Sequence, residues 1–386
     1  MPAPQLQLAR DTHVYAEKDG YFWKVPVLDG FSFSQSNATT EVTLSEMAGA
    51  NNSSRRGRKL FTDAFEPAEW NLQMYARPYD VTSPAVSGST DEVFWANFVN
   101  AGAYDHSTRL FTNGVDKGTA AHMDIDFNSS NVAALETFNL YFVLGACGTA
   151  ASAYNAGPGN PQTIYKVANA VCNSVSMDFD IDGILTLDWS GLGTLISEEA
   201  EMPVISPLWH TKIISDGIAH SEANFIRNRL TTLGVATAGP VAPFAETSYE
   251  LTLTGGNISF ENNITFLTPE ELCVVNQPIG NVTGTRNISG SFTCYLNAGD
   301  TVSGAGTSAD LFDDLASGTG VVTNSADLTF SIGGGAAPKV VVNIPTAHLE
   351  IPTHSIEDVI SLEVNFHALP GDLDETNEAT LEYHNS

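Results

Sequence analysis

The sequence predicts a mainly β protein with minor α content, built from two tandem modules that each carry one or two short helices. Three observations support this prediction. Apolar and polar residues alternate with a period of two along much of the 386-residue chain, as they do in strands with one buried face. Only 16% of the residues are charged, and 32 glycines suit strands that are joined by tight turns. The order of strand-like and helix-like segments in the first half also recurs in the second half.

In the first half, alternation marks the expected strands. The clearest run covers residues 69–79, where Glu69, Asn71 and Gln73 alternate with apolar residues. Residues 93–102 instead repeat their apolar residues at about one helical turn, which predicts a short helix. Further strands are expected in three segments: 21–36, 131–145 and 165–193.

The second half repeats this order of elements. A strand with one polar face is expected at residues 284–300. The polar residues of that face are Asn287, Ser289, Ser291 and Thr293. Residues 308–317 predict a short amphipathic helix, and residues 268–271 (TPEE) have the composition of a helix start, with proline in the first position. Further strands are expected in three segments: 249–267, 326–334 and 339–371.

The two halves match segment by segment in the same order. Residues 28–47 resemble residues 254–272, because each contains a glycine, an alternating strand, a polar turn and then an expected short helix. The helix-like segments of the two halves also correspond, and both end on glycine. We interpret the pattern as an internal duplication, with one module at residues 1–203 and the other at residues 204–386.

The charge balance of the chain is strongly acidic. Its 16 basic and 45 acidic residues give a formal net charge of −29. This favours solubility and argues against a protein that grips nucleic acid, because such a grip needs Lys and Arg to neutralise phosphates. The basic residues that cluster are Arg55, Arg56, Arg58 and Lys59. Two interpretations stay open for this cluster, a solvated loop or a contact with an acidic patch of a neighbouring subunit, and nuclear localisation or DNA binding ranks behind both.

Motifs for catalysis and cofactor binding are missing from the sequence. The four cysteines lack metal-finger spacing, and no P-loop, HExxH, GxSxG or GxGxxG motif occurs. His122, Asp124 and Asp126 would share one strand face, where we favour an ordinary polar surface over a metal site. We therefore expect no enzymatic activity, no cofactor and no metal. No signal-like start and no apolar run of about 20 residues is present, so we expect no membrane association and folding in a reducing cytoplasm.

The stretch DFDIDG has the spacing that opens a calcium-binding loop. Its carboxylates are Asp178, Asp180 and Asp182, but position twelve of the loop, which requires a glutamate, is Trp189. The intervening residues are apolar and alternate strictly with the aspartates, as in a half-buried strand. The sequence therefore predicts an acidic strand face here. A metal-dependent hydrolase that uses these aspartates, or the group around His122, is the least favoured hypothesis.

Three stretches of the second half carry a family resemblance. They are NNITFLTPEEL, NQPIGNVTGTR and ISGSFTCYL, all within residues 255–296. Together they resemble the hallmark segment of the tail tube (major tail) proteins of long-tailed, non-contractile phages (siphophages). In the first half, FSFSQSNATTEVTLSEMAG followed by RRGRKLFTDAFEPAEWNLQMYARPY resembles a second, diverged copy of the same unit.

The resemblance implies a fold, an assembly and a location. The modules would be β-sandwich or barrel-like, and their sheets would join around a ring into one continuous inner β-barrel. A duplicated chain would form homotrimeric rings with pseudo-hexameric symmetry. The rings would stack into the tail tube, with other tail proteins at its ends, and genomic DNA would pass through the lumen during ejection without specific binding. The protein would be assembled in the host cytoplasm and belong to the virion tail.

The resemblance also assigns roles to residues found above. The candidate lumen-facing residues are Glu69, Asn71, Gln73, Asn287, Ser289, Ser291 and Thr293, although a plain solvent-facing strand side would look the same. The basic cluster becomes a candidate contact between subunits. An acidic lumen would repel the phosphate backbone, so that DNA slides instead of binding. The alternative function is another virion or surface β-protein, such as a capsid decoration, a baseplate component or an adhesin.

Overall fold

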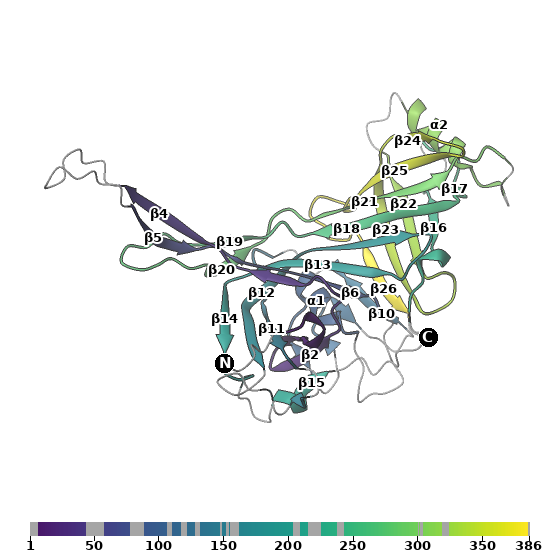
Figure 1. Ribbon diagram of the computed structural model, residues 1–386. Helices are drawn as coiled ribbons and strands as arrows, with labels where there is room; N and C mark the ends of the chain where they lie inside the picture. The colour runs from purple at the N-terminus through teal and green to yellow at the C-terminus, as the bar shows by residue number, and fades with distance from the viewer. Residues whose placement is uncertain are drawn as a thin grey trace, which may run out of the picture.

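The computed structural model of the chain describes residues 7–43, 58–77, 89–105, 110–116, 122–127, 132–146, 149–151, 154, 162–203, 209–214, 225–237, 243–299, 301, 304–318 and 324–384. These residues form a mainly β structure with two α-helices, as the sequence predicts (Figure 1). The helices are α1 (Glu92–Phe98) and α2 (Ser308–Ser317), which confirms the two helical segments expected at 93–102 and 308–317. Among the described residues, no helix is long and apolar enough to cross a membrane.

One wide antiparallel sheet, which we call the polar sheet, runs through both halves of the chain. Its strands, in spatial order, are β3 (Ser32–Ser34), β6 (Ala68–Tyr75), β13 (Thr186–Gly193), β12 (Thr163–Asp180), β18 (Leu253–Glu261), β21 (Asn287–Tyr295), β25 (Ile360–Ala368) and β24 (Thr353–Ile356). The halves meet where the end of β12 pairs with β18, from Ser174 opposite Glu261 to Asp180 opposite Gly255. A single sheet surface therefore spans the molecule.

Behind the polar sheet, the first half adds a second layer. It consists of β2 (Tyr21–Val25), β1 (His13–Lys18), β11 (Phe138–Leu144), the first part of β12 and β14 (Leu195–Glu199). The long strand β12 thus bends from one layer into the other. The short β15 (Ile213–Ile214) joins β2 in parallel. Three small elements complete this side: η1 (Ala9–Asp11), η5 (Trp209–Lys212) and the pair β7 (Tyr104–Asp105) and β8 (Leu110–Phe111).

The second half builds its back layer in the same manner. Its strands are β17 (Ser248–Tyr249), β16 (Thr232–Ala236), β22 (Ala326–Ile332), β23 (Lys339–Leu349) and β26 (Thr380–His384). Two strands of the first half, β10 (His122–Asp126) and β9 (Val115–Asp116), extend this layer beyond β26. A short turn, η7 (Asn228–Leu230), precedes β16. The halves are therefore joined in the back layer as well as in the polar sheet.

The core lies between the layers and is continuous across both halves. Helix α1 is entirely buried in it, because every residue from Glu92 to Phe98 is shielded from solvent. Its Trp95 ring contacts Trp189 at 4.9 Å and Phe260 at 5.7 Å between ring centroids, so it touches polar-sheet strands of both halves. Helix α2 is more exposed and buries Ser308, Leu311 and Leu315.

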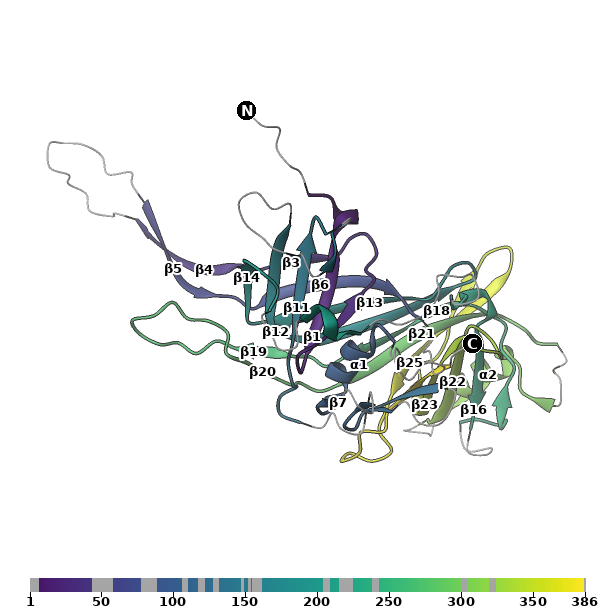
Figure 2. The ribbon, with the colours of Figure 1, turned by 90° about the horizontal axis from the view of Figure 1, so that it is seen from below.

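Two hairpins leave the body on the same side and form what we call the arm. They are β4 (Asn37–Thr43) with β5 (Arg58–Phe65), and β19 (Thr265–Leu267) with β20 (Gly280–Val282). Both lie next to one another in Figures 1 and 2, opposite the end that carries α2. The helix start expected at 268–271 is wrong, since these residues form an irregular connection between β19 and β20. A helix there would have no core to cover, because Leu272 is 94% exposed.

Candidate channel and assembly surfaces

The polar sheet has one buried face and one hydrophilic face. Along β6 the burial alternates residue by residue, so that Trp70 and Leu72 are buried while Glu69 and Asn71 are exposed. The same alternation continues on β13, β12, β18, β21 and β25. Period-two alternation turns successive side chains to opposite faces, and the buried face packs on the core. The hydrophilic side chains of the strands therefore share one surface.

Strand register brings these side chains into rows that cross both halves. One row consists of Gln73, Asp188, Ser176, Ser259, Ser289 and His367. The next row consists of Thr186, Asp178, Asn257, Ser291 and Asn365. Ser174 and Ser190 lie within hydrogen-bonding distance at 2.7 Å, and the Asn257 side chain accepts a hydrogen bond from the Ser291 N–H at 2.9 Å. Hydrogen bonds that involve these side chains therefore connect neighbouring strands across the hydrophilic face.

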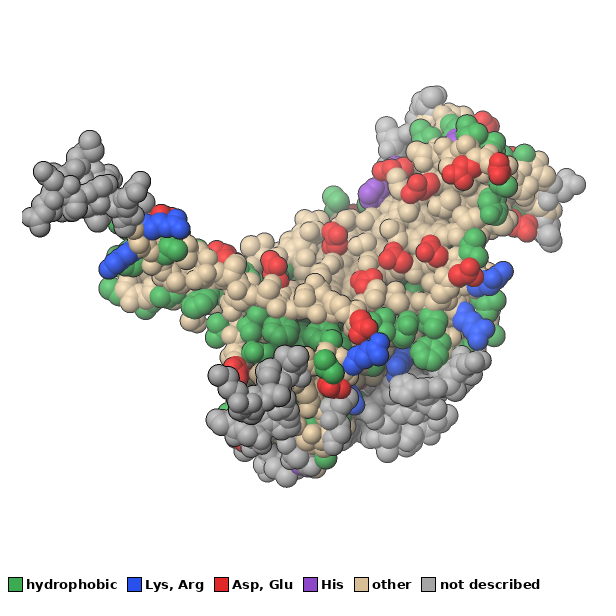
Figure 3. Space-filling model, viewed as in Figure 1, with side chains coloured by type: hydrophobic (Ala, Val, Ile, Leu, Met, Phe, Trp, Pro, Cys, Tyr) green, Lys and Arg blue, Asp and Glu red, His purple; other side chains and the backbone are tan. Residues whose placement is uncertain are grey.

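The charge of this face has one sign. Its carboxylates are Glu69, Asp178, Asp180, Asp188, Glu261 and Glu363. Neither Lys nor Arg occurs in β6, β13, β18, β21 or β25, or in residues 171–180 of β12. Figure 3 shows acidic side chains spread over the band between the arm and the α2 end, with Lys and Arg at its margins. With no cation among them, the carboxylates give the surface a negative potential.

The carboxylates also influence one another. Partial burial and the nearby Asp180 raise the pKa of Asp178. Partial burial likewise raises the pKa of Asp188, assisted by the charge of Asp178 and opposed by a hydrogen bond from Gln73. At the sheet end, hydrogen bonds from Asn365 and His367 lower the pKa of Glu350. The central aspartates therefore sit in a field of like charge.

The structure places all seven candidate lumen-facing residues on this one face. Glu69, Asn71 and Gln73 lie on β6, and three strands separate them from the others, which lie on β21. The hydrophilic residues of the strands in between, such as Ser176, Asp188 and Ser259, lie on the same face but were not among the lumen-facing residues predicted from the sequence. Alternation marked their strands, but only the register shows that they continue the same rows.

The DFDIDG stretch ends a strand, as the sequence predicts. Asp178 and Asp180 lie on the hydrophilic side of β12, while Phe179 between them is 2% exposed. Gly183 follows with φ +132°, a conformation that favours glycine, and turns the chain toward β13. Asp182 lies in that turn and pairs with Arg229 at 3.2 Å. The three carboxylates therefore do not surround a common point in the way that a calcium loop requires.

The arm is apolar where the polar sheet is hydrophilic. Its exposed large apolar residues are Val42, Leu60, Phe61, Leu267, Leu272, Val274, Val275, Ile279 and Val282. The two hairpins are held together by backbone hydrogen bonds, from the Phe65 N–H to the Asn276 carbonyl at 2.8 Å and from the Asn276 N–H to the Asp63 carbonyl at 3.0 Å. A group of exposed large apolar residues on a projecting element is typical of a protein interface.

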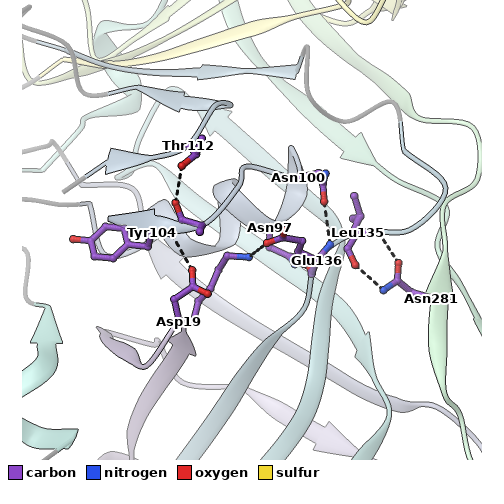
Figure 4. Close-up of polar contacts among 10 residues, drawn as sticks. Asp19, Asn97, Asn100, Tyr104, Thr112, Leu135, Glu136 and Asn281 are labelled. Carbon is purple, nitrogen blue, oxygen red and sulfur yellow. Dashed lines mark hydrogen bonds and ion pairs between the residues drawn. The ribbon is translucent and has the colours of Figure 1, made fainter. Parts of the chain in front are cut away.

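Side-chain amides anchor the arm to the body, as Figure 4 shows. The Asn281 side chain accepts a hydrogen bond from the Leu135 N–H at 2.7 Å and donates one to the Leu135 carbonyl at 2.9 Å. The neighbouring Glu136 N–H donates to Asn100 at 3.0 Å, and Glu136 forms an ion pair with Lys18 at 2.7 Å. The base of β20 is therefore fixed to the first half, although β20 belongs to the second half of the chain.

The basic cluster is only partly within the described residues. Arg58 and Lys59 are exposed at the start of β5, and Arg58 lies 3.6 Å from Glu41 of the facing strand. Arg55 and Arg56 lie outside the described residues. A contact of this cluster with a neighbouring subunit stays a prediction. His122, Asp124 and Asp126 lie on β10, which pairs with the C-terminal strand β26.

Comparison with known proteins gives two matches. A family model described as phage tail tube protein matches residues 78–368, which is most of the chain. The tail tube protein pb6 of Escherichia phage T5 is 27% identical over 385 residues, which cover 97% of this chain and 75% of that protein. The family-model match includes the polar sheet strands from β12 to β25 and the second hairpin of the arm.

Proposed function

The chain belongs to the phage tail tube protein family, and we propose that it polymerises as stacked rings in which the polar sheets together line a channel for DNA. Membership of the family makes the chain a structural protein of the virion tail rather than an enzyme. The observation that carries the proposal is the polar sheet, a hydrophilic surface with six carboxylates and no Lys or Arg in β6, β13, β18, β21 and β25 or in residues 171–180 of β12. Such a face suits a channel, because its carboxylates repel a phosphate backbone and it has no Lys or Arg to neutralise the phosphates.

The two ends of the polar sheet support closure into a ring. Among the described strands, β3 pairs only with β6, and β24 pairs only with β25. All four residues of β24 are exposed. Unpaired strand edges are templates for further pairing, and closure into a barrel removes them. Pairing of β24 from one subunit with the β3 edge of the next would produce one continuous inner β-barrel.

An internal duplication gives this ring its symmetry. Six strand pairings of the first half have counterparts in the same chain order in the second half. They are β1·β11 with β16·β22, β3·β6 with β18·β21, β4·β5 with β19·β20, β6·β13 with β21·β25, β11·β12 with β22·β23 and β12·β13 with β23·β25. Modules at 1–203 and 204–386 account for this recurrence, although residues 209–214 pack on the first. Three such chains would make a trimeric ring with pseudo-hexameric symmetry.

The arm then provides the contact between stacked rings. Its apolar residues project beyond the body and are covered only if another subunit packs on them. Arg58 and Lys59 on β5 would add contacts to acidic surfaces of that subunit. Other tail proteins would cap the ends of the tube, which assembles in the host cytoplasm and later conducts genomic DNA during ejection.

A cysteine cross-linking experiment tests ring closure and stoichiometry together. Ser34→Cys on β3 and Ser355→Cys on β24 would be combined in a Cys273→Ser background, which removes the one exposed free thiol among the described residues. Oxidation of assembled tubes is expected to give a ladder that ends at three chains on a non-reducing gel. Ser34→Cys alone is the matched control and forms no ladder. A ladder that continues to six chains would contradict trimeric rings, and its absence in microscopically intact tubes would contradict pairing of these edges.

Charge reversal tests the channel. Asp178→Lys combined with Asp188→Lys places cations in the centre of the polar sheet, whereas Asp313→Lys changes an exposed residue of α2. We expect the double variant to form tubes of normal length that retain DNA and slow its ejection, measured by release of dye-stained DNA from phage. The Asp313→Lys phage should eject normally. Equal ejection in both would show that the hydrophilic face does not line the channel.

A further inference from the structure

Four side chains of types that can bind a metal lie on a strand pair that joins the two halves of the chain, away from the polar sheet. His122 and Asp124 come from β10, and Glu382 and His384 come from β26. The register places His122 opposite His384, and Asp124 opposite Glu382. Because residues two apart on a strand share a face, all four side chains rise from the same side of this strand pair.

The distances within the cluster are short. One ligand atom each from His122, Glu382 and His384 lie within 4.8 Å of one another. His384 Nε2 is 2.9 Å from Glu382 Oε2, His122 Nε2 is 3.2 Å from Asp124 Oδ1, and the two imidazole rings are 5.0 Å apart between centroids. The side chains are half-buried, with His384 22% and His122 29% exposed.

The backbone of β10 and β26 fixes the positions of the four side chains. Met123 and Ile125 of β10 and Leu381 and Tyr383 of β26 point into the core and are fully buried. Core packing therefore fixes the backbone of both strands on the opposite face. Only side-chain torsions have to change to bring the ligand atoms together around one ion. Zinc binds imidazole nitrogen and carboxylate oxygen at about 2.0–2.2 Å in a tetrahedral arrangement, which two histidines and two carboxylates can supply.

We propose that His122, Glu382 and His384, with Asp124 as the fourth ligand, bind a divalent transition-metal ion such as Zn²⁺. The ion would tie β10 of the first half to the C-terminal strand β26 and so stabilise the junction of the two halves. This departs from the sequence-based expectation of no metal at His122, Asp124 and Asp126. Asp126 lies opposite Thr380, so the ligand set is completed across the strand pair instead of along one strand.

The neighbouring strand provides a counteracting charge. Lys339 of β23 lies opposite His384, and a nearby cation disfavours metal binding. Replacement of Lys339 by glutamine should therefore increase the affinity of the cluster for the metal ion. An ordinary arrangement of two separate ion pairs, His122 with Asp124 and His384 with Glu382, predicts no such effect.

The test is calorimetric titration of the purified, chelator-treated full chain with ZnCl₂ near neutral pH. We expect one Zn²⁺ per chain, an increase of the thermal unfolding midpoint, and affinity reduced at least about tenfold in His122→Gln and in His384→Gln. Lys339→Gln should bind more tightly than the unaltered chain. The matched control is His367→Gln, because His367 also pairs with a glutamate, at 3.2 Å from Glu350, but on the polar sheet.

Several results would overturn the proposal. They are an absence of saturable Zn²⁺ binding, or binding to His122→Gln and His384→Gln that is as strong as binding to the unaltered chain. Loss of affinity in His367→Gln to the same degree would indicate general binding to surface histidines. Circular dichroism of each variant checks that the substitutions of these half-buried histidines leave the fold intact. Because the protein is studied as a free chain, failure of this inference leaves the tail tube function untouched.

Discussion

The polar sheet and the arm are both antiparallel β-structure, yet they treat apolar side chains in opposite ways. On the polar sheet, apolar residues such as Trp70, Val175 and Phe292 point into the core and are at most 2% exposed. On the arm, Leu60 is 61% and Leu272 is 94% exposed. The first region buries its apolar area within the chain, and the second leaves its apolar area to be covered by something else.

This difference separates folding from assembly. A substitution in the buried side of the polar sheet should change the stability of the free chain, because the contacts that it removes are internal. A substitution in the arm should leave that stability nearly unchanged and affect only a state in which the arm is covered. Matched substitutions in the two regions therefore test the comparison directly.

The largest effect is expected at the centre of the core. Trp95→Ala removes a fully buried ring that contacts Trp189 and Phe260, and it should lower the free energy of unfolding by about 3–5 kcal/mol. Phe61→Ala on the arm, where the ring is 51% exposed, should change it by less than about 0.5 kcal/mol. Urea denaturation of the free chain measures both. Comparable losses would mean that the arm is part of the folded core.

The next effect depends on pH and concerns a buried carboxylate behind the polar sheet. Burial raises the pKa of Asp91 to about 7, against hydrogen bonds from Tyr383 at 2.7 Å and Trp95 at 3.2 Å. The folded state therefore holds the Asp91 proton more tightly than the unfolded state, whose pKa is about 3.8. The contribution of this group to stability is complete below pH 3.8 and is lost as the pH rises through 7.

Replacement of Asp91 by asparagine should remove that pH dependence. Relative to the unaltered chain, Asp91→Asn is expected to gain roughly 2–4 kcal/mol in unfolding free energy between pH 4 and pH 8, measured by urea denaturation at each pH. Asp63→Asn is the control on the arm, where the carboxylate accepts a hydrogen bond from Thr40 at 2.5 Å and is exposed. An unchanged slope in Asp91→Asn would show that Asp91 stays ionised in the folded chain.

The sequence predicted the local structure of single strands and helices better than it predicted which distant strands pair with one another. Alternation identified the faces of β6 and β21, because burial of one side imposes a period of two. It could not show that Gln73 and Ser289 lie in one row, since that depends on pairings between distant segments, such as Asp178 with Asn257. The helix at 308–317 formed because Thr307 and Asp310 make a capping box and Leu311 is buried. The start at 268–271 had the right composition and nothing to pack against.

Glycine replacements give a smaller effect that again separates the regions. A Cβ atom on Gly290 of β21 would lie 2.1 Å from the Asn257 carbonyl and 2.8 Å from the Phe366 ring. Gly290→Ala should therefore cost about 1–3 kcal/mol of unfolding free energy, since the strands must move apart. Gly280 of β20, in the arm, has no atom within 4 Å of the same position. Gly280→Ala should be nearly neutral in the same assay, and an equal loss at both positions would contradict the difference in packing.

The smallest effect is expected on the hydrophilic side of the polar sheet. The pKa of Asp178 is raised, so this group stabilises the folded chain only at low pH, and that stabilisation is lost as the pH rises above 3.8. Because the side chain is largely exposed, Asp178→Asn should leave the unfolding free energy at pH 7 unchanged or higher by less than about 0.5 kcal/mol. A loss of more than about 1 kcal/mol in urea denaturation would place Asp178 among the residues that the fold requires. If the carboxylate proves dispensable for folding, its remaining physical effect is the negative potential over the sheet, which acts only on what passes in front of it.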